Sequence, residues 1–239
     1  MDEACLGGRE LNFEALDLLE PAPEVLDRLR RYGKLLLEVA LPRGLIGFEP
    51  TRVSEQIVRS LALLEVLDQP SSVIDVGSGA GLPGIPLAIA LAGSHARKST
   101  SVILVEPKRR AVTFLEQAVR ELGLKVEIVA EPAEKVARGR LRESGDAVVA
   151  RALAPLPVVT ELCAPLAAVR GVVIVTAGST PDSNYALGRL DRLGLEIPRT
   201  VSLSRIRNVE QRVHIMRKIG PTSPLYPRRP GLARRRPLW

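Results

Sequence analysis

Hydrophobic residues recur at helical spacing through the first third of the chain, from residue 10 to about residue 67. Ile57, Leu61 and Leu64 form one such set, on a single face of a helix. The sequence PRG at residues 42–44 interrupts the pattern and separates two helical parts. We therefore predict a helical N-terminal extension over residues 1–68.

Beyond Pro70, short apolar runs alternate with longer helical patterns. The predicted strands cover residues 73–76, 101–106, 126–129, 147–150 and 172–176. The predicted helices cover residues 85–91, 108–122, 132–142 and 158–169. Such alternation is typical of a mainly parallel, doubly wound sheet, and strands at 201–203 and 213–216 are expected to add an antiparallel hairpin at its edge. We therefore predict a Rossmann-like α/β domain over residues 69–220.

A glycine-rich segment, DVGSGAGLPG at residues 75–84, joins the first of these strands to the first helix. Glycines at such a turn permit positive φ and a close approach of ligand to backbone, although a plain tight turn is the alternative. A dinucleotide needs the spacing G-x-G-x-x-G, whereas Gly77, Gly79 and Gly81 are spaced G-x-G-x-G behind Asp75. An acid there repels a pyrophosphate but suits S-adenosylmethionine, which carries an amino group and a sulfonium charge.

Acidic residues also follow the next two predicted strands. Glu106 ends the second strand, where a carboxylate can bind both hydroxyls of a ribose. Ala133 and Glu134 begin the helix after the third strand, beside the expected adenine edge. Each acid also has an ordinary interpretation, as an exposed strand-end glutamate for Glu106 and as a helix-start acid for Glu134.

The sequence VIDVGSGAGLPGIPLAI at residues 73–89 contains the glycine segment. It resembles the bacterial 16S rRNA guanine-N7 methyltransferases, the small-subunit methyltransferase G family (glucose-inhibited division protein B). Three later segments are similar to that family in the same order: KRRAVTFL at 108–115, VARALAPL at 149–156 and PLYPRRPG at 224–231. The likeness runs from about residue 50 to residue 239. It implies a Rossmann-like, S-adenosylmethionine-dependent methyltransferase that acts on N7 of a guanine in 16S rRNA of the small ribosomal subunit.

The resemblance also implies which residues hold the cofactor. The implied positions are Gly77, Leu82, Glu106, Ala133, Glu134 and Arg151, with Pro107 and Lys108 beside them. The loop argument adds Asp75 and Gly79. Arg151 follows the fourth predicted strand, and the carboxyl ends of parallel strands border the ligand crevice, although a surface arginine is the alternative.

At several positions the chain departs from the family pattern. The departures are Glu55-Gln56 and Arg59 for an Arg-His pair and an Asp, Ala177-Gly178 for Lys-Gly, and Gln211-Arg212 for Arg-His. The resemblance implies that these positions face the RNA. They favour an alternative function, a non-catalytic relative that binds cofactor or RNA without turnover. A nicotinamide-dependent dehydrogenase is a third hypothesis, which the loop spacing disfavours.

Methyl transfer to guanine N7 needs little side-chain chemistry. N7 is a lone-pair acceptor without a proton, so no general base is required, and we assign no catalytic residue. Holding the reacting atoms in line can by itself lower the barrier by about 7–11 kcal/mol. We interpret the two histidines, His95 and His214, as structural or solvent-facing.

The chain has 34 Lys and Arg against 27 Asp and Glu, a net charge of +7 that favours a polyanionic partner, here 16S rRNA or the small ribosomal subunit. Much of the excess lies in a Pro- and Arg-rich tail over residues 221–239. We predict that five arginines of this tail contact RNA phosphates: Arg228, Arg229, Arg234, Arg235 and Arg236. A solvated, disordered tail is the alternative.

Other chemistry is not expected. Only two cysteines occur, Cys5 and Cys163, which argues against a disulfide scaffold and a zinc site. No apolar run reaches the ~18 residues that a membrane span needs, and the acidic start of the chain does not open a signal peptide. We therefore expect a cytoplasmic monomer that uses neither a metal nor a membrane.

Overall fold

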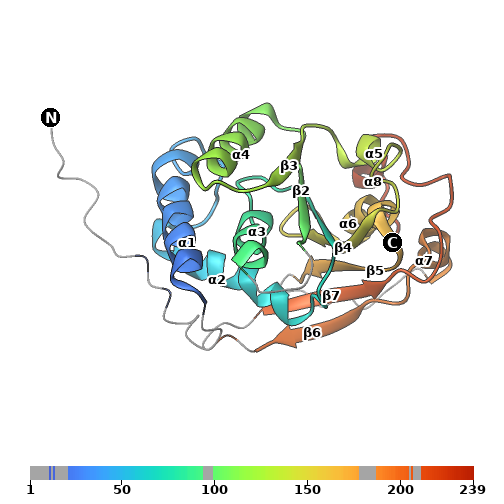
Figure 1. Cartoon of the computed structure of the whole chain (residues 1–239). Helices are drawn as coiled ribbons and strands as arrows, with labels where there is room; N and C mark the ends of the chain where they lie inside the picture. The colour runs from blue at the N-terminus through green and yellow to red at the C-terminus, as the bar shows by residue number, and fades with distance from the viewer. Residues whose placement is uncertain are drawn as a thin grey trace, which may run out of the picture.

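The computed structural model describes residues 11, 13, 21–93, 99–177, 187–204, 206 and 211–239. Within these residues a seven-stranded sheet runs through the centre, with helices on both faces (Figure 1). The strands are β1 (Ser72–Val76), β2 (Ser101–Val105), β3 (Val126–Val129), β4 (Gly145–Ala150), β5 (Ala167–Thr176), β6 (Arg199–Leu203) and β7 (Gln211–Arg217).

The order of strands across the sheet is β3-β2-β1-β4-β5-β7-β6. Strands β1 to β5 are parallel, and β7 is antiparallel to both of its neighbours. The predicted fold class is therefore confirmed, including the hairpin at the sheet edge. The order of the strands reverses between β1 and β4, and ligands of doubly wound folds bind at that point.

Helices cover both faces of the sheet. They are α1 (Pro23–Leu35), α2 (Val53–Leu61), α3 (Gly84–Gly93), α4 (Arg109–Glu121), α5 (Ala133–Val136), α6 (Leu156–Cys163), α7 (Leu187–Leu193) and α8 (Leu232–Arg235). None of the helices in the described ranges is both long and apolar enough to cross a membrane.

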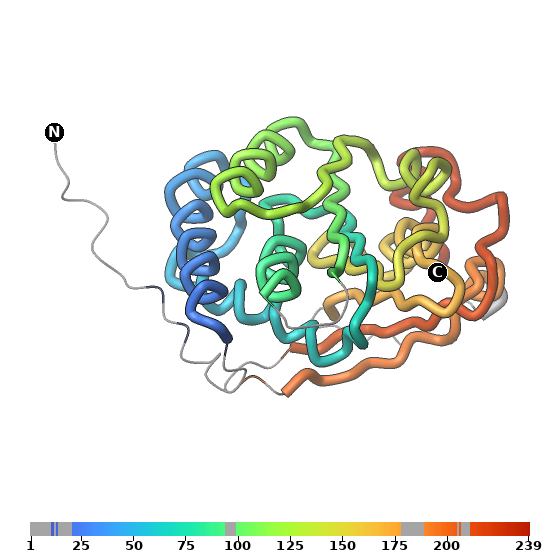
Figure 2. The backbone as a smooth tube through the Cα atoms, in the orientation of Figure 1, coloured from blue at the N-terminus to red at the C-terminus, as the bar shows by residue number. Residues whose placement is uncertain are grey.

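Strand side chains alternate between two separate cores. Val73 and Leu104 pack into a core with α1, α2, α3 and α4, whereas Ile74 and Val105 pack into a second core with α5, α6 and α7. The backbone tube shows the two groups of helices on opposite sides of the sheet (Figure 2). Burial on both faces explains why these strands are continuously apolar in sequence.

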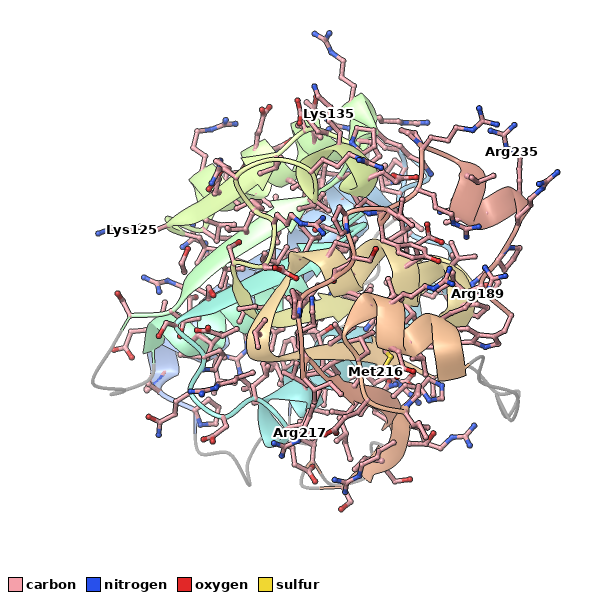
Figure 3. The ribbon with its side chains drawn as sticks, turned by 90° about the vertical axis from the view of Figure 1, so that its right-hand side faces the viewer. Lys125, Lys135, Arg189, Met216, Arg217 and Arg235 are labelled. Atoms are coloured by element: carbon pink, nitrogen blue, oxygen red, sulfur yellow. The ribbon has the colours of Figure 1, made fainter. Side chains whose placement is uncertain are left out.

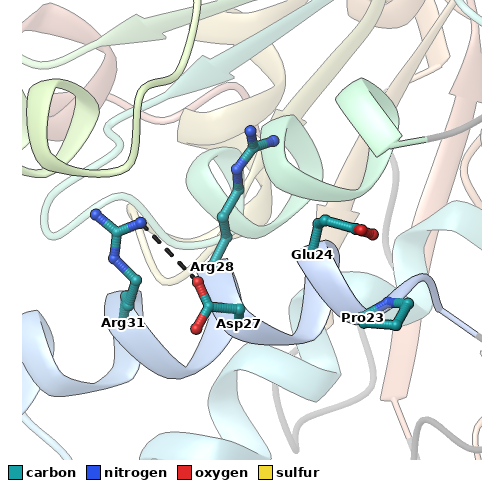
Figure 4. A pocket seen from close by; sticks show the side chains of 5 residues that line it. All are labelled: Pro23, Glu24, Asp27, Arg28 and Arg31. Atoms are coloured by element: carbon teal, nitrogen blue, oxygen red, sulfur yellow. Dashed lines mark ion pairs between the residues drawn. The ribbon is translucent and has the colours of Figure 1, made fainter.

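The described N-terminal residues are helical, as predicted. Helix α1 packs against α3, where a Cβ atom placed on Gly93 would lie 2.4 Å from Val25 Cγ2. A hollow follows the outer side of α1, lined by Pro23, Glu24, Asp27, Arg28 and Arg31 (Figure 4). Its charges are of both signs: Glu24, Asp27 and Arg31 are exposed, and Arg28 is partly buried. Arg31 lies 3.9 Å from Asp27 across one helical turn. None of its lining residues belongs to the predicted cofactor set.

Two predicted helices are shorter than expected. The helix predicted over 132–142 ends at Val136, because turns that include Gly139 follow it. The helix predicted over 158–169 ends at Cys163, since Pro165 lacks the N–H that would continue the helix, and strand β5 already begins at Ala167. Helices α7 and α8 were not predicted from the sequence.

Candidate functional site

The glycine segment forms a tight bend between β1 and α3. Gly77, Gly79 and Gly81 have φ angles of +73°, +56° and +91°, a region that residues with a side chain rarely adopt. The N–H of Gly77 donates to the Val105 carbonyl at 2.8 Å, which ties the bend to the end of β2. The bend therefore needs glycines for its backbone, as predicted from the sequence.

The space beside these glycines differs from one to the next. A Cβ atom on Gly77 would lie 2.4 Å from Leu153 Cδ1, and one on Gly84 would lie 2.3 Å from Leu104 Cδ2. On Gly79 the nearest atom would be the Gly77 carbonyl oxygen at 3.9 Å. Gly79 therefore has an open side that a ligand can approach.

Asp75 lies at the end of β1, directly under the bend, and is completely buried. Its Oδ2 accepts a hydrogen bond from the Gly84 N–H at 3.1 Å. Its Oδ1 is the buried side-chain oxygen for which the described residues supply no partner. Burial raises the pKa of the Asp75 carboxyl to about 7, although the nearby charge of Arg151 acts in the opposite direction. An unpartnered buried carboxylate is costly, so a cationic ligand would stabilise it.

Glu106 lies on the other side of the bend, directly after β2. Its Oε2 accepts from the Gly79 N–H and its Oε1 from the Lys108 N–H, both at 2.9 Å. Each carboxylate oxygen has further lone pairs, so Glu106 can still accept hydrogen bonds from a ligand's hydroxyls. The backbone of Lys108 belongs to this arrangement, whereas the side chains of Pro107 and Lys108 are exposed.

Tyr32, on α1, is a contributor that sequence analysis missed. Its buried hydroxyl donates to the Ala80 carbonyl in the middle of the bend at 2.6 Å. Burial raises the pKa of the Tyr32 phenol well above its usual value, so the phenol keeps the proton that it donates. The tyrosine sits in an ordinary helical pattern, and no sequence signal marks a contact between residues 48 positions apart.

The remaining predicted cofactor residues lie in the bend or follow β3 and β4, at the same edge of the sheet. Ala133 is buried at the start of α5, and Leu82 is buried in the bend. Glu134 is partly buried, and its Oε1 accepts from the Gly231 N–H at 3.0 Å. The side chain of Glu134 therefore contacts the Pro- and Arg-rich residues 221–239, which we call the C-terminal segment. Its predicted place beside an adenine stays a prediction.

Arg151 reaches from the end of β4 to helix α2. Its Nη1 donates to the Gln56 carbonyl at 3.0 Å and to the Ser60 hydroxyl at 3.2 Å, and its Nη2 donates to Gln56 Oε1 at 2.8 Å. The guanidinium is therefore fixed between the bend and α2. This geometry does not fit the alternative of a free surface arginine.

The positions that depart from the family pattern lie close together. Arg59 Nε donates to Glu55 Oε1 at 2.7 Å, and Arg59 Nη1 lies 3.4 Å from Gln211 Oε1 on β7. Hydrogen bonding to Arg52 lowers the pKa of Glu55 to about 2. Gln56, the residue after Glu55, is bound by Arg151 instead, so these departures take part in two neighbouring groups of polar contacts on α2.

Four other residues complete the comparison with the sequence predictions. The Ala177 N–H donates to the Arg212 carbonyl at 2.9 Å. His214 is buried in β7 with its Nδ1 3.0 Å from the Thr200 hydroxyl, in line with a structural role. Gly178 and His95 lie outside the described residues.

The arginines of the C-terminal segment are of two kinds. Arg228 forms an ion pair with Glu161 of α6, whose side chain is 1% exposed. The other four, Arg229, Arg234, Arg235 and Arg236, are exposed. Tyr226 and Leu238 are buried in the second core, so the segment lies against the body of the protein. The alternative of a disordered tail does not describe it.

Together these features fit a ligand with an adenosyl group and a positive charge. Asp75 offers an oxygen without a partner, Gly79 an open backbone, and Glu106 a carboxylate for hydroxyl groups. Residues 75–84 supply one carboxylate, Asp75, and no side-chain cation, and Glu106 adds a second carboxylate beside them, which does not suit a pyrophosphate.

Comparisons with known proteins find similar sequences and similar folds. The family model of the rRNA small subunit methyltransferase G matches residues 25–193. A ribosomal RNA small subunit methyltransferase G from Kineococcus radiotolerans is 39% identical over 88% of this chain and 83% of its own. One from Rubrobacter xylanophilus is 35% identical over 90% of this chain and 84% of its own.

Solved structures support the fold. A SAM-dependent methyltransferase from Aquifex aeolicus superposes with a TM-score of 0.50 at 17% identity, over 71% of this chain and 94% of its own. The resemblance predicted from the glycine segment is confirmed by the family model and by these relatives. The chain belongs to the rRNA small subunit methyltransferase G family.

Proposed function

We propose that this protein transfers a methyl group from S-adenosylmethionine to N7 of a guanine in 16S rRNA, as free RNA or within the small ribosomal subunit. Family membership supports the reaction class, and the relatives' names give the substrate. On the same basis we propose a cytoplasmic monomer that needs no metal. We assign the cofactor to the bend of residues 75–84 with Glu106.

The observation that carries the cofactor assignment is the Asp75 carboxylate, which is buried beneath the bend with one oxygen unpartnered. Burying an ionised group without a partner is unfavourable, so this arrangement is best explained by a cationic ligand above it. A nicotinamide dinucleotide would bring two phosphate charges to the same place and be repelled.

When bound, the cofactor supplies an activated methyl group on a positively charged sulfur. The chain's own residues then have three tasks. Gly79 and Glu106 hold the adenosyl part, and Asp75 stabilises the positive end. Arg151, fixed by Gln56 and Ser60, borders the pocket on the α2 side. Because N7 carries no proton, no residue has to remove one, and orientation supplies the rate enhancement.

The test is methylation of small-subunit RNA with methyl-labelled cofactor, followed by mapping of 7-methylguanine. We expect label at a guanine, and binding of S-adenosylhomocysteine by calorimetry. Binding of S-adenosylhomocysteine without labelled guanine in free RNA or in subunits would replace this proposal by the non-catalytic alternative. Thermal stabilisation by NADH but not by S-adenosylhomocysteine would contradict the cofactor assignment.

A further inference from the structure

The C-terminal segment is firmly anchored beside the proposed pocket. Arg142 Nη1 donates to the Tyr226 carbonyl at 2.9 Å, and its Nη2 donates to the Thr222 carbonyl at 2.8 Å. Arg138 donates to the Pro227 carbonyl. These contacts lie on buried or partly buried backbone, so the segment has a defined position on the protein.

Arg228 contributes to this anchoring. Its Nε donates to Glu161 Oε1 at 2.8 Å, and its backbone N–H donates to the same oxygen at 3.0 Å. The Arg228 guanidinium also contacts the Arg236 carbonyl at 2.7 Å. With its donors used in this way, Arg228 holds the segment in place, and its charge is neutralised by Glu161.

The other four arginines have no such buried acid beside them in the described part of the chain. Arg229, Arg234, Arg235 and Arg236 are exposed, and we call them the C-terminal basic patch. No Asp or Glu occurs in residues 221–239, so no acid of this segment offsets their charge. Figure 3 shows Arg235 at the upper right of the molecule and Lys135 of α5 at the top.

Two contacts place the patch next to the proposed cofactor site. Arg234 Nη2 donates at 3.2 Å to the carbonyl of Leu153, whose side chain lies against Gly77. The Gly231 N–H, at the start of α8, donates to Glu134 at the start of α5. Both contacts are with segments that follow parallel strands, on the edge of the sheet where the bend lies.

We propose that the C-terminal basic patch binds the phosphate backbone of the RNA strand whose guanine enters the pocket, with Arg228 as a structural anchor and not an RNA ligand. This inference rests on the proposed function for the identity of the polyanion. Four exposed arginines on an anchored segment suit phosphates at fixed spacing, because the segment does not have to be ordered on binding.

The test compares RNA binding by two triple variants. R229Q/R235Q/R236Q removes three charges from the patch but keeps Arg234, which contacts Leu153. K125Q/R199Q/R217Q removes three exposed charges elsewhere, and Figure 3 shows Lys125 and Arg217 far from Arg235 in that view. Both sets of side chains are exposed, and thermal unfolding checks that both variants fold.

We expect the patch variant to bind a 16S rRNA fragment about tenfold more weakly at 0.15 M salt. The slope of log affinity against log salt should fall by about 2, since each lost phosphate contact on a single strand contributes about 0.7. The control variant should keep most of the affinity. R229K/R235K/R236K should restore the slope, and all variants should bind S-adenosylhomocysteine as the unmodified protein does.

Equal RNA affinity and an equal salt slope for the patch variant and the control would overturn the inference. So would loss of binding to vesicles of phosphatidylcholine and phosphatidylserine with RNA binding intact, because the patch would then serve a membrane. Failure of the proposed function is distinguishable, since the unmodified protein would then bind RNA without methylating it.

Discussion

Two buried carboxylates, those of Asp75 and Glu161, differ in whether both of their oxygens have hydrogen-bond partners. Glu161 on α6 is 1% exposed and accepts hydrogen bonds from Arg228 to both of its oxygens. Asp75 under the glycine bend is equally buried, yet within the described residues one of its oxygens has no partner. A paired buried carboxylate destabilises the fold when its partner is removed, whereas an unpaired one already weakens the fold and is available to a ligand.

The same contrast separates the two regions around them. Buried polar groups around the C-terminal segment bind one another, as Lys218 shows by donating to Glu143 and to Thr222. The bend leaves the open side of Gly79 and the second oxygen of Asp75 unused. Substitutions in the first region should therefore change stability, and those in the second should change ligand affinity.

The largest effect is expected from Arg228→Gln. It leaves the buried Glu161 carboxylate without its counter-charge and should lower the free energy of unfolding by about 3 kcal/mol. Arg235→Gln, on an exposed arginine of the same segment, should change it by less than about 0.5 kcal/mol. Urea unfolding measures both, and equal stabilities would remove the assignment of Arg228 as an anchor.

Gly79→Ala should separate stability from affinity. Gly123 is the matched control, because it has φ +62° and nothing within 4 Å of where a Cβ atom would lie, outside the bend. Both alanines should cost about 1–2 kcal/mol of stability from the left-handed backbone. Only Gly79→Ala fills the open side, so its affinity for S-adenosylhomocysteine should fall at least tenfold. Similar affinities for the two variants would place the ligand elsewhere.

Cofactor affinity should depend on pH through Asp75. Burial raises the pKa of this carboxyl to about 7, so below that pH it is mostly protonated and a cationic ligand must displace the proton. Affinity for S-adenosylhomocysteine should rise with pH and be about tenfold higher at pH 8 than at pH 6. In Asp75→Asn the calorimetric profile should be nearly flat, and an unchanged slope would assign the titration to another group.

The smallest effect is expected from Tyr32→Phe. Loss of the hydrogen bond to the Ala80 carbonyl should cost about 1 kcal/mol and weaken S-adenosylhomocysteine binding about fivefold, because the bend is held less firmly. Tyr226→Phe is the control, on a buried tyrosine in the other core. If both variants bind the ligand equally well, Tyr32 does not position the bend.

Sequence patterns predicted the strands, the sheet and the bend because each depends on local spacing. The glycines at 77, 79 and 81 and the acid before them form one continuous segment, and strand alternation fixes which edge they occupy. Pro165 and Gly139 also explain why two helices end earlier than predicted.

Apart from helices α7 and α8, the missed features are contacts between residues that are distant in the sequence. The Tyr32 contact with the bend spans 48 positions, and the Arg228 contact with Glu161 spans 67. A Pro- and Arg-rich composition resembles that of solvated segments, so it could not show that Tyr226 and Leu238 are buried. The contacts of Arg151 with Gln56 and of Arg59 with Gln211 likewise join residues that look unrelated in sequence.

The most direct measurement of the central claim is a crystal structure with S-adenosylhomocysteine. We predict that the ligand lies over Gly79, with its ribose hydroxyls within hydrogen-bond distance of Glu106 and its amino group on the side of Asp75. A bend that stays empty, or a ligand bound elsewhere with this space filled by side chains, would contradict it.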